Sequence, residues 1–150
     1  MLRHPLCVST QEELYNGQFQ ETIDDAVVDK TKVKTVVFVT GKFYYDILAE
    51  REKLGRNDVA LVRLEQLFPL PVEQLKEIIA SYSNADDFVW AQEEPKNMGA
   101  YSYMLMNFDL VPWRLASLKA YAAPAAGSHT RDRRRHTDAI RMVFDKNLFR

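Results

Sequence analysis

The sequence predicts an α/β protein with a mostly parallel sheet, whose strands alternate with helices along the chain. Residues 35–40 form a continuous β-branched, apolar run, which is typical of a strand covered on both faces. Similar short runs recur at 59–64 and 87–91, and segments with helical spacing separate them. Such alternation favours parallel strands joined by right-handed crossovers.

Composition places the chain among soluble globular proteins. Its 150 residues fit one domain, and 47% hydrophobic with 27% charged residues allow a sizeable core. The net charge of −1 gives no general attraction to nucleic acid or to an anionic membrane. The single cysteine, Cys7, excludes an internal disulfide and fits a reducing compartment. No apolar run approaches the roughly 20 residues of a membrane span, so we expect a soluble, cytoplasmic protein.

The first 32 residues carry few periodic signals. We expect them to form an arm or linker that comes from a preceding domain, with the folded α/β domain at 33–150. The arm is acidic, and Ser9-Thr10-Gln11-Glu12-Glu13 is expected to cap a short helical turn. The opening Leu2-Arg3-His4-Pro5 is irregular and looks cut from something longer.

The first two strand–helix units follow in order. The strand at 35–40 ends at Gly41-Lys42, and a helix is expected over 43–54, stopped by Gly55 as a C-cap. The strand at 59–64 leads into a rigid, proline-containing turn at 65–71. A helix over 72–82 then begins just after Pro71, where a proline costs no helical hydrogen bond.

Two further units complete the sheet. A strand at 87–91 is followed by an acidic turn and a helix over about 100–108. A fourth strand is expected at 118–122, followed by a loop through Gly127-Ser128-His129. The last helix is expected over about 130–149, with Ile140, Val143 and Phe144 inward and its arginines outward.

The acidic turn is the most informative segment. Trp90-Ala91-Gln92-Glu93-Glu94-Pro95-Lys96-Asn97-Met98-Gly99-Ala100-Tyr101 places two carboxylates at the carboxyl end of a strand, where ligands and partner domains dock in open α/β sheets. Neighbouring strand residues point to opposite sides, so Glu93 and Glu94 are poorly placed to act on one substrate. We expect one to bind a nearby basic group and the other to be solvated; an intersubunit contact is the alternative.

Catalytic and phosphate-binding motifs are absent from the sequence. There is no G-x-G-x-x-G, G-x-x-x-x-G-K-[ST] or G-x-S-x-G. Gly41-Lys42 lacks the remaining residues of a phosphate loop and is interpreted as a strand-to-helix turn. The three histidines are too scattered for a metal motif. His129 is expected to be exposed at the start of the last helix rather than catalytic.

Arginines concentrate at the start of the last helix. We call Arg131, Arg133, Arg134 and Arg135 the arginine cluster. A solvated helix face is the default interpretation, and a phosphate grip is the alternative, because guanidinium forks match phosphate geometry. Interleaved aromatic residues for base stacking are lacking, which disfavours nucleic acid.

Five motifs in one order carry a family resemblance. They are Leu2-Arg3-His4-Pro5, Thr40-Gly41-Lys42 with Tyr44-Tyr45-Asp46, Arg63-Leu64-Glu65-Gln66-Leu67-Phe68-Pro69, the segment 90–100, and Ala125-Ala126-Gly127-Ser128-His129. Together they closely resemble the C-terminal domain of the E1 component of the 2-oxoglutarate dehydrogenase complex. The resemblance covers nearly the whole chain.

The resemblance implies a transketolase C-terminal-like fold, a three-layer α/β/α domain with a five-stranded, mostly parallel sheet. The parent enzyme of the tricarboxylic acid cycle uses thiamine diphosphate and magnesium to decarboxylate 2-oxoglutarate, and it passes the succinyl group to the lipoyl arm of the E2 succinyltransferase. The preceding E1 domains hold the cofactor across a homodimer interface. This chain would therefore contain no catalytic, cofactor-binding or metal-binding residue, and would be inactive alone. Nothing in it separates 2-oxoglutarate from 2-oxoadipate as the parent's substrate.

In some actinobacterial relatives, the resembling domain binds acetyl-CoA as an effector. We therefore hypothesise an interface or effector site for acetyl-CoA or AMP. Its candidate residues are Arg63, Glu65, Glu93, Glu94, Lys96, His129, Arg131, Arg133 and Arg134. The competing hypothesis is a free-standing small α/β module that binds a nucleotide or CoA. An assembly domain should expose a large apolar patch, whereas a free module should not.

Overall fold

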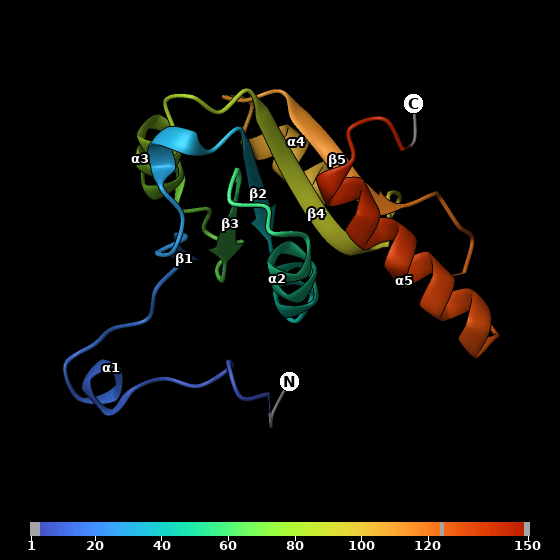
Figure 1. Ribbon diagram of the computed structural model, residues 1–150, viewed down its shortest axis with the longest axis horizontal. Helices are drawn as coiled ribbons and strands as arrows, with labels where there is room; N and C mark the ends of the chain where they lie inside the picture. Colours follow the sequence, from blue (N-terminus) through green and yellow to red (C-terminus); the bar gives the residue numbers. More distant parts are fainter. Residues whose placement is uncertain (1–3, 124, 149–150) are drawn as a thin grey trace.

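A five-stranded mixed sheet forms the centre of the molecule (Figure 1). The computed structural model describes residues 4–123 and 125–148. Strands β2, β3, β4 and β5 are parallel, and β1 pairs antiparallel with β3, giving the order β1-β3-β2-β4-β5. The strand bounds are β1 (Thr22–Ile23), β2 (Thr35–Val39), β3 (Val59–Leu64), β4 (Asp87–Pro95) and β5 (Trp113–Leu118). The predicted α/β class with a mostly parallel five-stranded sheet is confirmed.

Helices cover both faces of the sheet. They are α2 (Phe43–Leu54) and α5 (His129–Phe144) on one face, and α3 (Val72–Ser81) and α4 (Tyr101–Asn107) on the other. A hydrophobic core lies on each face of the sheet, and alternate residues of β2 point into one or the other. Val36 and Phe38 belong to the core under α3 and α4, while Val37 and Val39 belong to the core under α2 and α5. This arrangement is the expected three-layer α/β/α architecture.

Local sequence signals explain where the helices begin and end. Gly41 (φ 61°) turns the chain from β2 into α2, and Gly55 (φ 64°) ends α2 in the left-handed conformation. Pro71 precedes α3 directly. No helix in the described part of the chain is long and apolar enough to cross a membrane.

The predicted strand at 118–122 was wrong. The strand β5 lies earlier and pairs with β4 in the register Phe88↔Trp113 and Ala91↔Ala116. Beyond it, the Asn97 amide donates to the carbonyl of Tyr121 (3.0 Å) and accepts from the Tyr121 N–H (3.1 Å). Because a side chain occupies both backbone groups of Tyr121, that residue cannot extend the ladder.

Two other boundaries also differ from the prediction. The strand β4 continues through Glu93 and Glu94 to Pro95, past a register irregularity after Ala91, so the acidic pair lies in a strand rather than a turn. The helix α5 ends at Phe144 because Asp145 is extended and its side chain accepts from the Asn147 N–H at 2.8 Å. The predicted helix also included residue 149, which lies outside the described residues.

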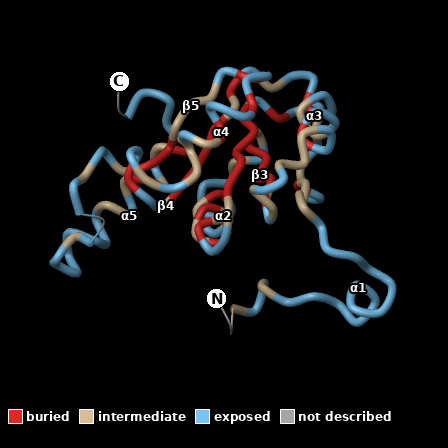
Figure 2. The backbone as a smooth tube through the Cα atoms, turned by 180° about the vertical axis from the view of Figure 1, so that it is seen from behind, coloured by how far each residue is buried: buried red, intermediate tan, exposed pale blue. Residues whose placement is uncertain are grey.

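The N-terminal segment divides into two parts. Residues 8–20 lie away from the body and are exposed, and they contain the short helix α1 (Gln11–Tyr15), which has the expected cap at Thr10 (Figures 1 and 2). Residues 21–32 pack on the domain instead: β1 joins the sheet, Asp25 is buried, and η1 (Lys30–Lys32) is a single 3₁₀ turn. The sequence did not predict β1, because two residues carry no periodicity.

Candidate functional site at the carboxyl edge of the sheet

The turn after β4 is held by the amide of Gln92, which is 3% exposed. Its Oε1 accepts from the indole N–H of Trp90 (2.9 Å) and from the Tyr101 N–H (3.1 Å). Its Nε2 donates to the carbonyl of Met98 at 2.8 Å. One side chain thus joins the strand, the turn and the start of α4, so the turn is rigid.

A glycine is required beside this amide. Gly99 has φ +68°, a conformation that L side chains rarely adopt. A Cβ at this position would meet both polar atoms of the Gln92 amide at 3.0 Å. The close approach explains the glycine in the motif.

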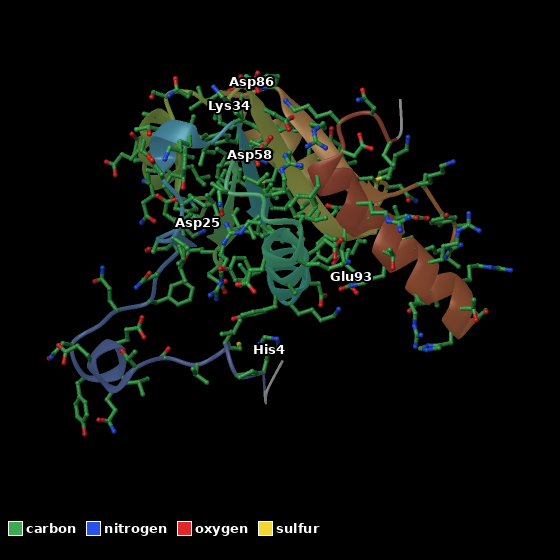
Figure 3. All side chains as sticks on the ribbon, viewed as in Figure 1. His4, Asp25, Lys34, Asp58, Asp86 and Glu93 are labelled. Atoms are coloured by element: carbon green, nitrogen blue, oxygen red, sulfur yellow. The ribbon has the colours of Figure 1, made fainter. Side chains whose placement is uncertain are left out.

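The acidic pair separates into two environments. Glu93 Oε1 accepts from Lys42 Nζ at 2.9 Å and lies 3.5 Å from His136 Nδ1. Glu94 is exposed. Figure 3 shows Glu93 in the space between α2 and α5. Glu93 therefore connects elements of its own chain, while Glu94 is available to a partner.

Four charged or titratable groups join α2, β4 and α5. Asp46 Oδ2 lies 3.5 Å from Lys42 Nζ and 3.4 Å from His136 Nε2, so Asp46 and Glu93 both flank Lys42 and His136. Burial disfavours the charge on Lys42, but the hydrogen bond to Glu93 and the attraction of Asp46 raise its pKa overall. This network holds α5 against α2. Sequence reasoning missed it: only the i,i+4 spacing of Lys42 and Asp46 was visible.

Arg63 lies at the end of β3 and stacks on two tyrosines. Its guanidinium carbon is 5.1 Å from the ring centroid of Tyr44 and 5.7 Å from that of Tyr45. Its Nε donates to Glu65 at 2.9 Å. The face of the planar guanidinium thus contacts the two tyrosine rings and its edge binds Glu65. Because Tyr44 and Tyr45 belong to α2, Arg63 helps to position that helix.

The start of the described chain packs on Tyr45, one of these two tyrosines. The His4 ring lies 4.6 Å from the ring of Tyr45. Burial, together with a hydrogen bond to Cys7, raises the pKa of the Tyr45 phenol to about 12. The two segments therefore meet through a tyrosine that stays protonated at neutral pH.

The arginine cluster lies on the first turns of α5. Arg131, Arg133 and Arg134 are exposed, and the His129 ring nitrogen Nε2 lies 2.8 Å from Arg133 Nη2. A hollow of about 460 Å³ runs along this side of α5. Its lining consists of His129, Thr130, Arg133, Arg134, Thr137, Asp138 and Arg141.

A second hollow, of about 550 Å³, lies between α5 and β5. Arg135 stacks on Tyr121 at 3.8 Å within it, and Arg131 and Arg134 lie at its border. Lys96 lines an adjoining hollow of about 470 Å³ along β5. The surface beside β5 therefore combines basic and apolar groups.

The candidate residues fall into separate patches. Glu93 and Glu94 share a hollow of about 240 Å³ with Asp132, Arg135 and His136. Arg63 lies on β3 and Glu65 directly after it, on the other side of β2, and no contact described within residues 4–123 or 125–148 joins them to the arginine cluster. Nor does any group of three His, Cys, Asp or Glu residues in those ranges have the placement to hold a metal ion.

The fold defines the class of the domain. The solved structure of a split-gene transketolase, described as an inactive tetramer of beta subunits, matches the domain with a TM-score of 0.57 and 16% sequence identity. The match covers 87% of this chain and 44% of that chain. The protein is thus an α/β domain of the transketolase C-terminal type.

Sequence comparison identifies the family within that class. Residues 8–144 match the 2-oxoglutarate dehydrogenase C-terminal family, and the chain belongs to it. The chain is 43% identical over 129 residues to the 2-oxoglutarate dehydrogenase E1 component of Haemophilus influenzae, covering 85% of this chain. It is 39% identical over 150 residues to the mouse 2-oxoadipate dehydrogenase complex component E1, covering 96% of this chain. It spans only 14% and 16% of the lengths of these relatives.

Proposed function

We propose that this chain is the C-terminal assembly domain of an E1 enzyme that decarboxylates a 2-oxo acid. The end of β4 and the rigid turn held by Gln92 carry the proposal, because they present Glu94 and Lys96, both exposed, at the carboxyl edge of the sheet. This is the edge where ligands and neighbouring domains dock in such sheets. The partners would be the preceding E1 domains and a second E1 subunit.

The cofactor of the proposed parent enzyme does not fit this chain. Thiamine diphosphate is held through a divalent metal, which needs several oxygen ligands. The described residues offer no such group. We therefore assign thiamine diphosphate, magnesium and the decarboxylation to the preceding domains. Transfer of the acyl group to an E2 component would also belong to the whole enzyme.

Exposed apolar side chains support assembly over the free-standing module. Phe68 is 83% exposed in the loop between β3 and α3, and Met106 is 77% exposed on α4. Burying such groups on a partner is favourable by about 1.5–3 kcal/mol per fully buried side chain. A domain that works alone gains nothing from exposing them.

A chimeric enzyme tests the proposal. Residues 8–150 of this chain would replace the matching segment of the Haemophilus influenzae E1 component. We expect the chimera to decarboxylate a 2-oxo acid with thiamine diphosphate, whereas the relative lacking that segment, and this chain alone, should be inactive. A chimera that is folded and monodisperse yet inactive on both 2-oxoglutarate and 2-oxoadipate would contradict the proposal. The preferred substrate would also be decided by this assay.

The charges of the acidic pair give a second test. In the chimera, reversing Glu94 with Glu94→Lys should weaken subunit association, while leaving the apparent affinity for thiamine diphosphate nearly unchanged. Reversal of Glu93 should in addition loosen α2 and α5, because Glu93 binds Lys42 at the start of α2 and lies 3.5 Å from His136 Nδ1 of α5. Analytical ultracentrifugation and cofactor titration measure the two effects separately. We also propose a cytoplasmic location, which cell fractionation checks.

The arginine cluster supports a second candidate function, the binding of an anionic effector such as acetyl-CoA or AMP. Exposed guanidinium groups of Arg133 and Arg134 border the hollow of about 460 Å³ and are suited to phosphate. Calorimetry with both ligands tests it, with Arg133→Ala as the matched variant. No heat with either ligand would count against effector binding. Saturable binding together with an inactive chimera would instead favour the free-standing module.

A further inference from the structure

Residues 8–20, which we call the outer loop, expose apolar side chains that the chain itself does not cover. Val8, Leu14, Tyr15 and Phe19 are 76%, 74%, 86% and 65% exposed. The helix α1 within the loop has a complete capping box but buries no residue. Five-residue helices are unstable alone in water, so the outer loop is suited to a surface outside this chain.

Both ends of the outer loop are fixed to the body. On one side, His4 packs on Tyr45. On the other side, the carbonyl of Glu21 accepts from the N–H groups of Glu65 (2.8 Å) and Gln66 (3.1 Å). The loop is thus held out from two anchors rather than left as a free terminus, and its position relative to the sheet is set.

The charge of the segment points to a basic partner surface. The outer loop contains no lysine and no arginine, and it contains Glu12 and Glu13. On the outer loop itself, Glu12 and Glu13 stand beside Leu14. A complementary surface would therefore combine apolar contacts with lysine or arginine at its border.

The molecule carries such a surface at its other end. The two hollows along β5, which is an edge strand, contain Leu115, Leu118 and Met142. We call this surface the β5–α5 groove. Its basic members are Lys96, Lys119, Arg131, Arg134, Arg135 and Arg141. Together with Asp138, these residues line a surface that is apolar and mainly basic, so it complements the apolar, acidic outer loop.

The outer loop and the groove of one molecule lie far apart. Figure 1 places α1 and the first turns of α5 at opposite ends of the long axis with α2 between them, and Figure 2 shows the same separation from behind. Because both ends of the loop are anchored, it does not reach its own groove. The complementary surface is therefore available only on another molecule.

We propose that the outer loop of one copy docks in the β5–α5 groove of a second copy, and that the second copy reciprocates. Such a two-fold arrangement uses both complementary surfaces and closes the assembly at a dimer. It deepens the assembly role proposed above by naming the surfaces and the partner. Two equivalent contacts also bury twice the area of one, which favours a stable interface.

Sedimentation equilibrium of the 150-residue protein tests this inference. We expect a dimer whose dissociation constant rises at least tenfold in Leu14→Asp/Phe19→Asp and in Arg131→Glu/Arg134→Glu. The loop variant should keep the wild-type circular-dichroism spectrum, since Leu14 and Phe19 are 74% and 65% exposed and α1 buries no residue. Val27→Asp is the matched control, because Val27 is 84% exposed but lies outside the outer loop, and it should leave dimerisation unchanged.

A charge exchange distinguishes a direct contact from a general effect. Adding Glu12→Arg/Glu13→Arg to Arg131→Glu/Arg134→Glu should restore at least part of the lost affinity, and added salt should weaken the wild-type dimer. A wild-type protein that stays monomeric, or a dimer that the loop and groove variants do not weaken, overturns the inference. An active chimera alongside a monomeric chain would leave the assembly role standing and reject only this contact.

Discussion

Replacing Asp25 with alanine should destabilise the domain strongly, although Asp25 belongs to the segment that the sequence assigned to an arm. The Asp25 carboxylate lies against Arg51 of α2, and both side chains are nearly buried, at 4% and 8% exposure. The same carboxylate accepts from the N–H groups of Leu61 (2.9 Å) and Val27 (3.0 Å). Figure 3 shows Asp25 directed into the body of the molecule.

The expected loss follows from what remains after the substitution. Among the described residues, the buried Arg51 guanidinium would keep only the carbonyl of Val59, at 3.2 Å, as a hydrogen-bond partner. Removing one member of a buried ion pair costs about 3–5 kcal/mol. That is a large share of the roughly 5–15 kcal/mol by which domains are stable. At about 2–4 °C per kcal/mol for a chain of this size, Tm should fall by about 6–20 °C.

Urea unfolding followed by circular dichroism measures the effect, with Arg51→Ala and the double variant completing a cycle. The double variant should lose less stability than the sum of the two single variants, because no unpaired charge remains. Asp29→Ala is the control: Asp29 also caps a turn but is largely exposed, so its shift should be much smaller. A loss below about 1 kcal/mol for Asp25→Ala, or strict additivity in the cycle, would refute the reasoning.

Three further predictions concern the turn at Gly99, the stability at acidic pH and the stability at alkaline pH. Gly99→Ala should cost about 1–3 kcal/mol in urea unfolding, through its positive φ and its contact with the Gln92 amide; an unchanged midpoint would contradict this. Burial opposes the charge of Asp87, but the hydrogen bonds and attraction of Arg114 lower its pKa. The stability from this pair is therefore present above pH 4 and lost as pH falls through the lowered pKa, and Asp87→Asn should flatten the acid limb of stability against pH. The pKa of Tyr45 is raised to about 12, so its effect on stability has the opposite dependence on pH. The contribution of Tyr45 is complete below about pH 10, the usual pKa of a tyrosine, and is lost as pH approaches 12. Tyr45→Phe should therefore make the loss of stability at alkaline pH shallower.

The segment before residue 33 has consequences for where the folded unit begins. The outer loop contributes no buried side chain, whereas β1 and Asp25 belong to the sheet and its core. We therefore propose that the folded unit begins near residue 21, while the expected boundary at 33 stays a prediction. A protein that starts at residue 21 should unfold cooperatively, while one that starts at 33 should leave Arg51 buried without its carboxylate.

The alternation of strands and helices, the class of fold and the family could be predicted from the sequence. The apolar run that forms β2, the C-cap at Gly55 and the proline before α3 act over a few residues, so local patterns reveal them. The resemblance rested on long motifs, and the comparisons confirm it. The division of the acidic pair between a bound and a solvated carboxylate followed from the alternation of side chains along a strand.

Tertiary packing decided the rest. The pairing of Asp25 with Arg51, of Glu93 with Lys42 and of the Asn97 amide with Tyr121 joins residues 24 to 51 positions apart, and no local periodicity reports such contacts. The last of these moved the edge strand to Trp113–Leu118 by occupying the backbone groups that a later strand would need. The sequence by itself therefore determined which elements form and to which family they belong. Only the tertiary structure decided which side chains meet at the carboxyl edge and which surfaces remain open to a partner, because those outcomes depend on long-range hydrogen bonds and burial.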